Sequence, residues 1–163
     1  MSTVYLGLGS NVDRTASIRR ALDLLRAEYD VVAVSPVYES PAEGMDSHPF
    51  LNCVVAVETP LSPETLRESL KRLEVACGRP RDHESWAPRT LDADLLLHGD
   101  TVDESLGIPD PDILTGPWVL VPLVDVAPDL IHPIERCPLC DLLADRVGWR
   151  DRLAPRTGIP VEE

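Results

Sequence analysis

The sequence predicts an α+β fold: a ferredoxin-like βαββαβ core, in which helices pack on an antiparallel sheet, plus a C-terminal extension. Two stretches with helical spacing of apolar residues alternate with short apolar or β-branched runs in the order that such a core requires. No internal repeat and no linker divides the 163 residues, a length that suits one compact domain. We therefore expect residues 1–163 to form a single domain, with a loose tail over about 150–163.

The first half of the chain supplies one strand, one helix and two further strands. Residues 3–8 form an apolar run that ends in a Gly/Ser/Asn cluster, which predicts a strand. Helical spacing then predicts an amphipathic helix over about 14–28, with an apolar face of Ile18, Ala21, Leu22 and Leu25. Runs 31–39 and 51–58 are rich in β-branched or apolar residues and predict two strands, joined by a polar loop over 40–49.

The second half begins with a helix that starts at Ser62-Pro63, a capping hydroxyl followed by proline at the first helical position. Gly78 is the natural end of that helix. A polar loop over 79–88 then precedes a strand over about 90–98. The remainder is proline-rich, with helical turns expected near 116–126 and 138–147.

Charge and composition exclude several classes of partner. The formal net charge of −13 argues against polyanions, so we expect no binding to nucleic acid or to a membrane. No apolar run approaches the ~20 residues of a membrane span, and the N-terminus lacks a secretory pattern, so a cytoplasmic protein with reduced cysteines is expected. Cys137 and Cys140 form a lone Cys-x-x-Cys pair with His132 as the obvious third ligand, and we favour two small apolar residues in a turn over a metal or redox site.

The densest chemical signal lies around the strand expected near residue 92. Arg79, Arg81 and Arg89 gather within eleven residues of an otherwise acidic chain, and Asp92 and Asp94 follow at alternate positions. Strand side chains alternate, so the two aspartates share one face, and the other face is expected to carry Leu91, Ala93, Leu95 and Leu97. Paired carboxylates suit Mg²⁺ and nearby guanidinium groups suit phosphate, which together indicate a Mg-nucleotide or polyphosphate site. The alternatives are a solvated edge strand and surface salt bridges with Asp82 and Glu84.

A second cluster suits a flat heterocycle. Phe50 and Asn52 stand at alternate positions after the polar loop, where one can stack on a ring and the other can bond its edge. Trp118 is a second stacking candidate, although both rings could instead fill the core. The chain has no P-loop motif, and Gly7-Leu-Gly9 lacks the third glycine of a dinucleotide fingerprint, so it predicts only a strand-to-helix turn.

Both clusters, in this order and spacing, resemble the 6-hydroxymethyl-7,8-dihydropterin pyrophosphokinase family of folate biosynthesis. The resemblance covers about residues 3–145 and is most specific in one string, Trp86-Ala-Pro88-Arg89-Thr-Leu-Asp92-Ala-Asp94. Further matching pieces are Gly9-Ser10-Asn11, Ser40-Pro41, Gly44, Phe50-Leu51-Asn52, Glu74, Arg79-x-Arg81, Pro122-Leu123 and Ala127-Pro128.

The resemblance implies an ATP-dependent diphosphotransferase that moves the β,γ-pyrophosphoryl group of ATP to the hydroxymethyl oxygen of the dihydropterin and leaves AMP. It implies that Asp92 and Asp94 hold two Mg²⁺ ions and that these aspartates act in catalysis together with Arg79 and Arg89. The implied ATP contacts are Glu74, Arg81, Leu95, Leu106 and Ile108. The implied pterin contacts are Ser40, Pro41, Glu43, Gly44, Phe50, Asn52 and Trp118. A monomer or weak dimer is expected.

One stretch departs from the family pattern. The family usually reads Ile-Pro-His-Pro-Arg, with another arginine before an aromatic residue, whereas this chain has Asp110 and Asp112 in place of the cations and Gly116 in place of the later arginine. Three explanations stay open: compensating contacts from Lys71 or Arg136, another phosphate donor or acceptor, or an impaired paralogue that still binds pterin. A ferredoxin-like small-molecule regulatory module is the alternative from a different class, and it would not need paired aspartates beside three arginines.

Overall fold

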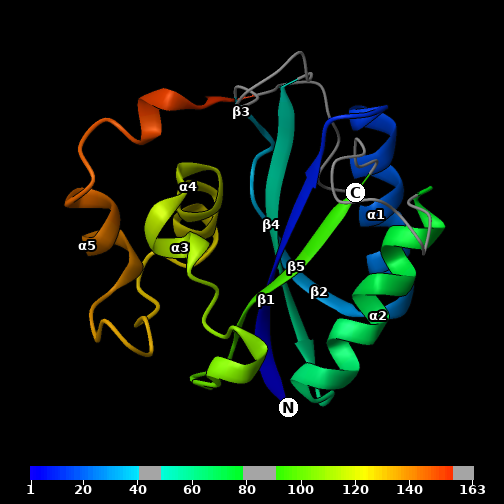
Figure 1. The fold of residues 1–163 in the computed structure, drawn as a ribbon, viewed down its shortest axis with the longest axis horizontal. Coiled ribbons are helices and arrows are strands. Elements are labelled where there is room, and N and C mark those ends of the chain that lie inside the picture. Colours follow the sequence, from blue (N-terminus) through cyan, green and yellow to red (C-terminus); the bar gives the residue numbers. More distant parts are fainter. Residues whose placement is uncertain (41–48, 79–90, 156–163) are drawn as a thin grey trace.

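The computed structural model describes residues 1–40, 49–78 and 91–155, and it is built on one antiparallel sheet (Figure 1). The sheet has six strands in the order β5-β1-β4-β3-β6, and β2 also pairs with β4. All of these pairings are antiparallel. The strands are β1 (Ser2–Ser10), β2 (Asp30–Val34), β3 (Tyr38–Ser40), β4 (Phe50–Thr59), β5 (Asp92–His98) and β6 (Ala154–Pro155).

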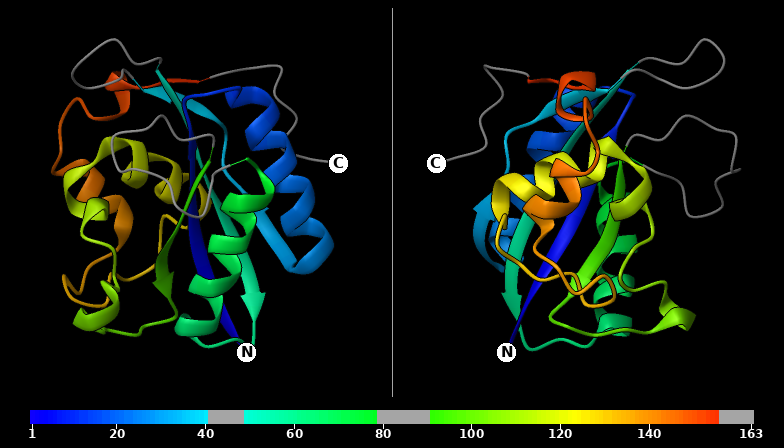
Figure 2. Two further views of the ribbon diagram at one scale, coloured as in Figure 1. Left: turned by 45° about the vertical axis from the view of Figure 1, so that its right-hand side comes forward. Right: turned by 90° about the vertical axis from the view of Figure 1, so that its left-hand side faces the viewer.

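Helices cover both faces of the sheet, which confirms the predicted α+β class and adds a layer to it (Figures 1 and 2). On one face lie α1 (Arg14–Glu28) and α2 (Pro63–Ala76), the helices of the βαββαβ core. The C-terminal extension covers the other face with α3 (Asp112–Thr115), α4 (Pro117–Val126) and α5 (Leu139–Ala144). Two short 3₁₀ turns, Glu104–Leu106 and Arg150–Arg152, complete the described elements.

Aliphatic side chains form a separate core on each face of the sheet. The core under α1 and α2 joins the apolar stripes of both helices to inward residues of β1, β4 and β5. The core under α4 and α5 is built on the opposite face from residues such as Leu120, Leu123 and Leu142. Ser62 caps α2 as expected: its hydroxyl accepts the backbone N–H of Thr65 at 3.2 Å, and Pro63 occupies the first turn.

The expected strand over 31–39 is wrong as a single element, because it divides into β2 and β3. The break lies at Ser35-Pro36-Val37, where proline has no backbone N–H to give to a neighbouring strand. Ser35 bridges the gap: its N–H donates to the carbonyl of Val54 at 2.9 Å and its hydroxyl accepts the N–H of Val54 at 2.9 Å. The division releases β3 to pair with both β4 and β6.

Strand β5 contains an irregularity that corrects the predicted alternation. Leu95 pairs with Leu6 and Leu97 pairs with Tyr5, so Leu96 is an extra residue between the two pairs. Leu91, Ala93 and Leu95 face α1 and α2 as predicted. Leu97 does not, because the extra residue places it with Leu96 in the core on the opposite face. The predicted common face of Asp92 and Asp94 precedes the bulge and is unaffected.

The expected tail needs correction at its start. Residues 150–155 are a 3₁₀ turn followed by β6, which pairs Pro155 with Tyr38 and Ala154 with Glu39 of β3. Within the described parts of the chain, no helix is long and apolar enough to cross a membrane.

Candidate active site

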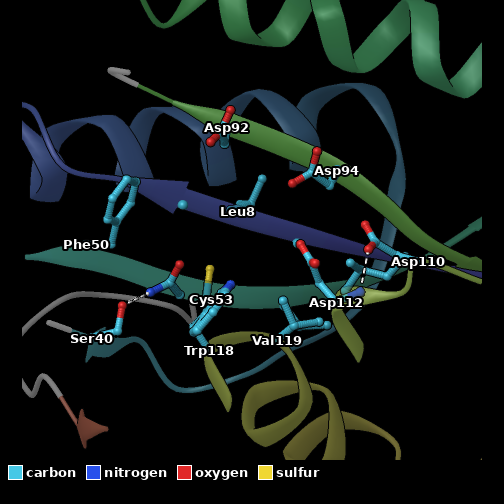
Figure 3. A pocket seen from close by; sticks show the side chains of 15 residues that line it. Leu8, Ser40, Phe50, Cys53, Asp92, Asp94, Asp110, Asp112, Trp118 and Val119 are labelled. Carbon is cyan, nitrogen blue, oxygen red and sulfur yellow. Dashed lines mark hydrogen bonds between the residues drawn. The ribbon is translucent and has the colours of Figure 1, made fainter. Parts of the chain in front are cut away.

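A cavity of about 500 Å³ lies on the sheet face that carries α3 and α4 (Figure 3). Its floor consists of neighbouring residues of β5, β1 and β4: Asp92 pairs with Gly9, and Gly9 pairs with Asn52. Gly7 and Gly9 therefore lie inside β1, not in the turn expected from the sequence. The cavity is lined by Gly7, Leu8, Gly9, Ser40, Phe50, Asn52, Cys53, Val54, Asp92, Asp94, Leu96, Asp110, Asp112, Trp118 and Val119.

One end of the cavity is lined by uncharged side chains, two of which are hydrogen-bonded to each other. Asn52 and Ser40 are both buried, and the Asn52 Nδ2 donates to the Ser40 hydroxyl at 2.9 Å. The register of β3 with β4 places Ser40 opposite Phe50, so one short strand pair supplies three lining residues. Gly9 makes room for the amide, since a Cβ on Gly9 would lie 3.1 Å from the Asn52 Oδ1.

Trp118 enters the same end of the cavity from the first turn of α4. Gly116 permits this placement, because a Cβ at Gly116 would lie 2.8 Å from the Trp118 Cε2 atom and 3.2 Å from the carbonyl oxygen of Asp112. No side chain fits there without a shift of the indole or the backbone. In this chain Gly116 is therefore a steric requirement of the Trp118 position.

The other end of the cavity is lined by four aspartates (Figure 3). Asp92 and Asp94 come from β5, while Asp110 and Asp112 come from the segment that enters α3. A hydrogen bond joins that segment to β5: the N–H of Asp110 donates to the Leu96 carbonyl at 2.9 Å. The Asp110 Oδ1 in turn accepts the N–H of Asp112 at 2.8 Å. The two aspartates that depart from the family pattern thus face the site.

Burial and neighbouring carboxylates raise the affinity of Asp94 for a proton. Desolvation, followed by the charges of Asp92, Asp110, Glu74 and Asp112 in that order, raises the pKa of Asp94 to about 7. Desolvation also raises the pKa of Asp110, partly offset by the hydrogen bond from Asp112. Solvent still reaches Asp94 at the cavity surface, which screens the coulombic contributions. This end of the cavity therefore favours an added positive charge.

A second cavity of about 210 Å³ lies between α2 and β5, and Asp94 and Asp110 line both cavities. Its other lining residues are Arg67, Leu70, Lys71, Glu74, Ala93 and Leu95. Glu74 is tied to β5, because its Oε2 accepts the N–H of Ala93 at 2.9 Å. Two cations, Arg67 and Lys71, thus stand beside the carboxylates. The sequence analysis did not single out Arg67, although its spacing of four residues from Lys71 places both on one face of α2.

The structure describes some of the remaining predicted contact residues, and others lie outside its described part. Leu95 lines the second cavity, whereas Ile108 is buried in the core under α1 and α2 and Leu106 packs against that core. Arg136 lies in the 132–137 turn and is not among the residues that line either cavity. The predicted contacts that lie outside the described part of the chain are Pro41, Glu43, Gly44, Arg79, Arg81 and Arg89, and residues 86–90 of the matching string lie outside it too.

Cys140 of the Cys-x-x-Cys pair lies in α5, and neither cysteine lines either of the two cavities. Both cysteines are reduced and pack against the core under α4 and α5. His132 accepts the N–H groups of Ile134 and Glu135 at 3.2 Å and 3.1 Å through its Nδ1, so that nitrogen closes a turn. Among the residues the structure describes, no group of three or more His, Cys, Asp or Glu side chains could hold a metal ion by itself.

The profile of the family described as 7,8-dihydro-6-hydroxymethylpterin-pyrophosphokinase (HPPK) matches residues 5–128. The chain belongs to this family. The HPPK match spans the whole cavity, from β1 to the end of α4.

Named relatives agree with the HPPK assignment, and a solved structure shares the fold. The 2-amino-4-hydroxy-6-hydroxymethyldihydropteridine pyrophosphokinase of Aquifex aeolicus is 40% identical over 143 residues, which cover 85% of this chain and 89% of the relative. The enzyme of the same name from Pseudomonas aeruginosa is 42% identical over 147 residues, covering 86% and 90%. A crystal structure of Plasmodium falciparum HPPK-DHPS has the same fold, with a TM-score of 0.73 at 15% identity over 90% of this chain. The present chain corresponds to 46% of that longer chain.

Proposed function

We propose that this chain transfers pyrophosphate from MgATP to the hydroxymethyl group of 6-hydroxymethyl-7,8-dihydropterin, giving AMP, in folate biosynthesis. The observation that carries the proposal is that one cavity combines a site suited to a flat heterocycle with a site suited to Mg²⁺ and phosphate. A neutral end with an amide and two aromatic rings meets an end with four carboxylates within about 500 Å³. Membership of the HPPK family and the names of relatives at about 40% identity support the same reaction.

The neutral end suits the pterin. Phe50 and Trp118 offer ring faces to a flat heterocycle, and Asn52 is held in one orientation by its bond to Ser40. A buried amide that is already oriented can discriminate the hydrogen-bonding edge of a pterin at little further entropic cost. Pro41, Glu43 and Gly44 belong to the proposed pterin site by resemblance and lie outside the described residues.

The carboxylate end suits Mg²⁺. Asp92 and Asp94 supply oxygen ligands side by side on β5, where burial and then the neighbouring carboxylates raise the pKa of Asp94. Asp92 and Asp94 would hold two Mg²⁺ ions, which would supply positive charge to neutralise the phosphates of the nucleotide. Glu74 and Leu95 line the adjoining cavity and are proposed nucleotide contacts together with Leu106 and Ile108.

The reaction requires positioning and charge neutralisation more than covalent participation by the protein. The hydroxymethyl oxygen bonds to the β-phosphorus as the bond from that phosphorus to the oxygen shared with the α-phosphorus breaks. AMP leaves with that oxygen, and the hydroxyl proton is lost to solvent. Arg79, Arg81 and Arg89 are proposed to stabilise the developing charge, and they lie outside the described part of the chain.

Asp110 and Asp112 bear on the alternative of an impaired or altered-donor paralogue. Both face the cavity, so their charges oppose an anionic nucleotide unless cations offset them. Lys71 and Arg67 stand beside Asp94 and Asp110 in the second cavity, which supports compensation from α2 and favours the active enzyme. A cytoplasmic monomer or weak dimer completes the proposal.

The test is AMP release by the purified protein from ATP and Mg²⁺, with and without 6-hydroxymethyl-7,8-dihydropterin. AMP that requires the pterin and disappears in Asp94→Ala is the expected result. No pterin-dependent AMP at millimolar ATP, in a protein that still binds the pterin, would defeat the proposed reaction and favour the paralogue.

A further inference from the structure

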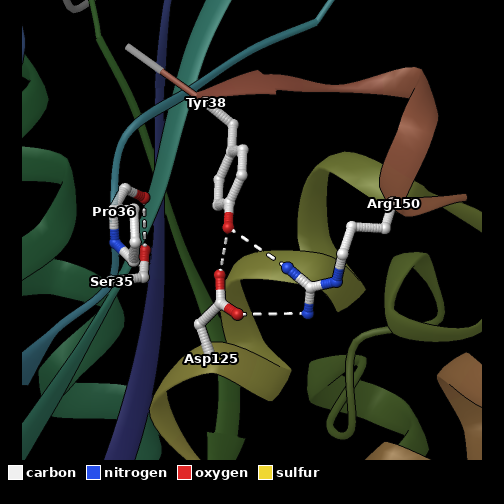
Figure 4. Close-up of polar contacts among 5 residues, drawn as sticks. All are labelled: Ser35, Pro36, Tyr38, Asp125 and Arg150. Carbon is white, nitrogen blue, oxygen red and sulfur yellow. Dashed lines mark hydrogen bonds and ion pairs between the residues drawn. The ribbon is translucent and has the colours of Figure 1, made fainter. Parts of the chain in front are cut away.

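Three side chains from distant parts of the sequence meet behind the neutral end of the cavity (Figure 4). The Tyr38 hydroxyl donates to the Oδ2 of Asp125. Arg150 donates from Nη1 to the Tyr38 oxygen at 3.3 Å and from Nη2 to the Asp125 Oδ1 at 3.1 Å. We call these three residues the Tyr38 network. It joins β3, α4 and the C-terminal segment 150–155.

The network lies next to the residues proposed to hold the pterin. Tyr38 is two residues before Ser40 on β3, and both side chains are buried. Asp125 is seven residues after Trp118 on α4, which places the two side chains on one face of the helix. Between them, Val121 packs with Tyr38 and Leu153 in a small core against which Trp118 also packs.

The C-terminal segment 150–155 completes the Tyr38 network and the small core beside it. Its strand β6 pairs with Tyr38 and Glu39 of β3, Leu153 enters the small core, and Arg150 closes the network. The segment therefore holds two elements at a fixed separation: the strand that carries Ser40 and the helix that carries Trp118. Both of those residues line the neutral end.

We propose that Arg150 and Asp125 are positioning residues that keep Ser40 and Trp118 in place in the pterin site by holding β3 against α4. The proposal rests on the proposed function for the identity of the ligand. Neither residue lines the cavity, so each acts through Tyr38 and through the elements it joins.

Several observations favour positioning over a role in stability alone. The Arg150 side chain is 50% exposed, and exposed ion pairs contribute little to stability. Its two nitrogens nevertheless engage two different elements at once, a geometry that the planar guanidinium provides and a lysine ammonium does not. Desolvation and then the hydrogen bond to Asp125 raise the pKa of Tyr38 to about 12, so its hydroxyl remains a donor at every physiological pH.

The test compares Arg150→Met and Asp125→Asn with a matched control, Arg146→Met. Arg146 also belongs to the C-terminal extension, but it donates to the carbonyls of Leu114 and Leu142, away from β3. For each protein, calorimetry gives the Kd for 6-hydroxymethyl-7,8-dihydropterin and, separately, for MgATP, and a melting curve gives Tm.

We expect the pterin Kd to rise three- to tenfold in Arg150→Met and Asp125→Asn while the MgATP Kd stays within twofold. Arg146→Met is expected to leave both constants unchanged, and Arg150→Lys is expected to recover only part of the loss. Unchanged pterin Kd values with lowered Tm overturn the proposal and leave a structural network. Equal losses for both ligands overturn it too.

The outcome is separable from the fate of the proposed reaction. Binding is measured without turnover, so a wild type that binds the pterin but releases no AMP defeats the reaction and leaves the positioning result intact. A wild type that binds no pterin overturns the inference itself.

Discussion

The two ends of the large cavity share one face of the sheet but are completed in different ways. At the neutral end, Asn52 bonds Ser40, and Trp118 has the space that Gly116 provides. At the acidic end, Asp92, Asp94, Asp110 and Asp112 gather on β5 and on the segment before α3, and the pKa of Asp94 is raised. The neutral end is thus preorganised by the protein, whereas the acidic end favours positive charge that a ligand must bring.

This difference predicts that substitutions at the two ends separate the two substrates. The neutral end should control pterin affinity, because its shape and hydrogen bonds exist before binding. The acidic end should control the response to Mg²⁺ and nucleotide, because its charges require partners. Substitutions at either end therefore test whether pterin affinity and the response to Mg²⁺ and nucleotide can change independently.

The largest effect is expected from Asp92→Asn. An amide lacks the negative charge that Mg²⁺ requires, and metal-assisted stabilisation of phosphoryl transfer is worth several kcal/mol, so kcat/KM should fall at least ~100-fold. Asp100→Asn, in the exposed turn after β5, is the matched control and should retain activity. Steady-state AMP release and pterin calorimetry make the measurement. Loss of pterin binding in Asp92→Asn would show that the ends are not separate.

The next effect is expected from Asn52→Ala. The variant loses the oriented amide and leaves the buried Ser40 hydroxyl without its donor, at a cost of about 1–3 kcal/mol. The pterin Kd should rise roughly 5- to 150-fold. Ser40→Ala, which keeps the amide, should cost less. MgATP affinity should be unchanged in both, and a parallel loss of MgATP affinity contradicts the division.

The elements were more predictable from the sequence than their positions. Helical spacing and the Ser62-Pro63 cap gave α1 and α2 closely, since local propensity decides such features. The bulge at Leu96 and the split between β2 and β3 were missed, because pairing with distant strands decides where a strand bends. The place of the C-terminal extension was missed because α4 is apolar on nearly all sides, which does not specify which face it covers.

The site shows the same limit. The spacing of Asp92 and Asp94 predicted a shared face, and the structure places both in the cavity with Phe50, Asn52 and Trp118. The cross-strand register of Gly7 and Gly9 with Asp94 and Asp92 could not be predicted from residues 80 or more positions apart. Arg150 was missed for a similar reason, since its partners lie on β3 and α4.

A smaller effect is expected from Asp110→Asn combined with Asp112→Asn. Removing two carboxylates from the acidic end reduces repulsion of the nucleotide, worth about 1 kcal/mol for charges screened by solvent. The KM for ATP should fall about three- to tenfold, with pterin Kd unchanged. Lys71→Ala should move the KM for ATP in the opposite direction, and Arg72→Ala, whose side chain does not line the second cavity, serves as its control. An increase in KM in the double variant would mean that these aspartates help to bind cations.

Near neutral pH, the smallest effect is the one that pH itself has at the acidic end. Because the pKa of Asp94 is raised to about 7, the folded protein binds this proton more tightly than the unfolded chain does. Without Mg²⁺, Asp94 therefore lowers the free energy of unfolding as the pH rises from 3.8, the ordinary pKa of the group, to about 7. Above pH 7 it adds no further pH dependence.

Mg²⁺ binds the ionised carboxylate, so the affinity of the protein for Mg²⁺ should fall up to about tenfold per pH unit below 7 and should be constant above it. In the Asp110→Asn, Asp112→Asn variant, two of the charges that raise this pKa are gone, so the break should move to lower pH. Titrating the Mg²⁺-dependent rise in Tm across pH 5–9 measures the break in both proteins. A break that does not move would show that desolvation, Asp92 and Glu74 set it, and that Asp110 and Asp112 are screened from β5.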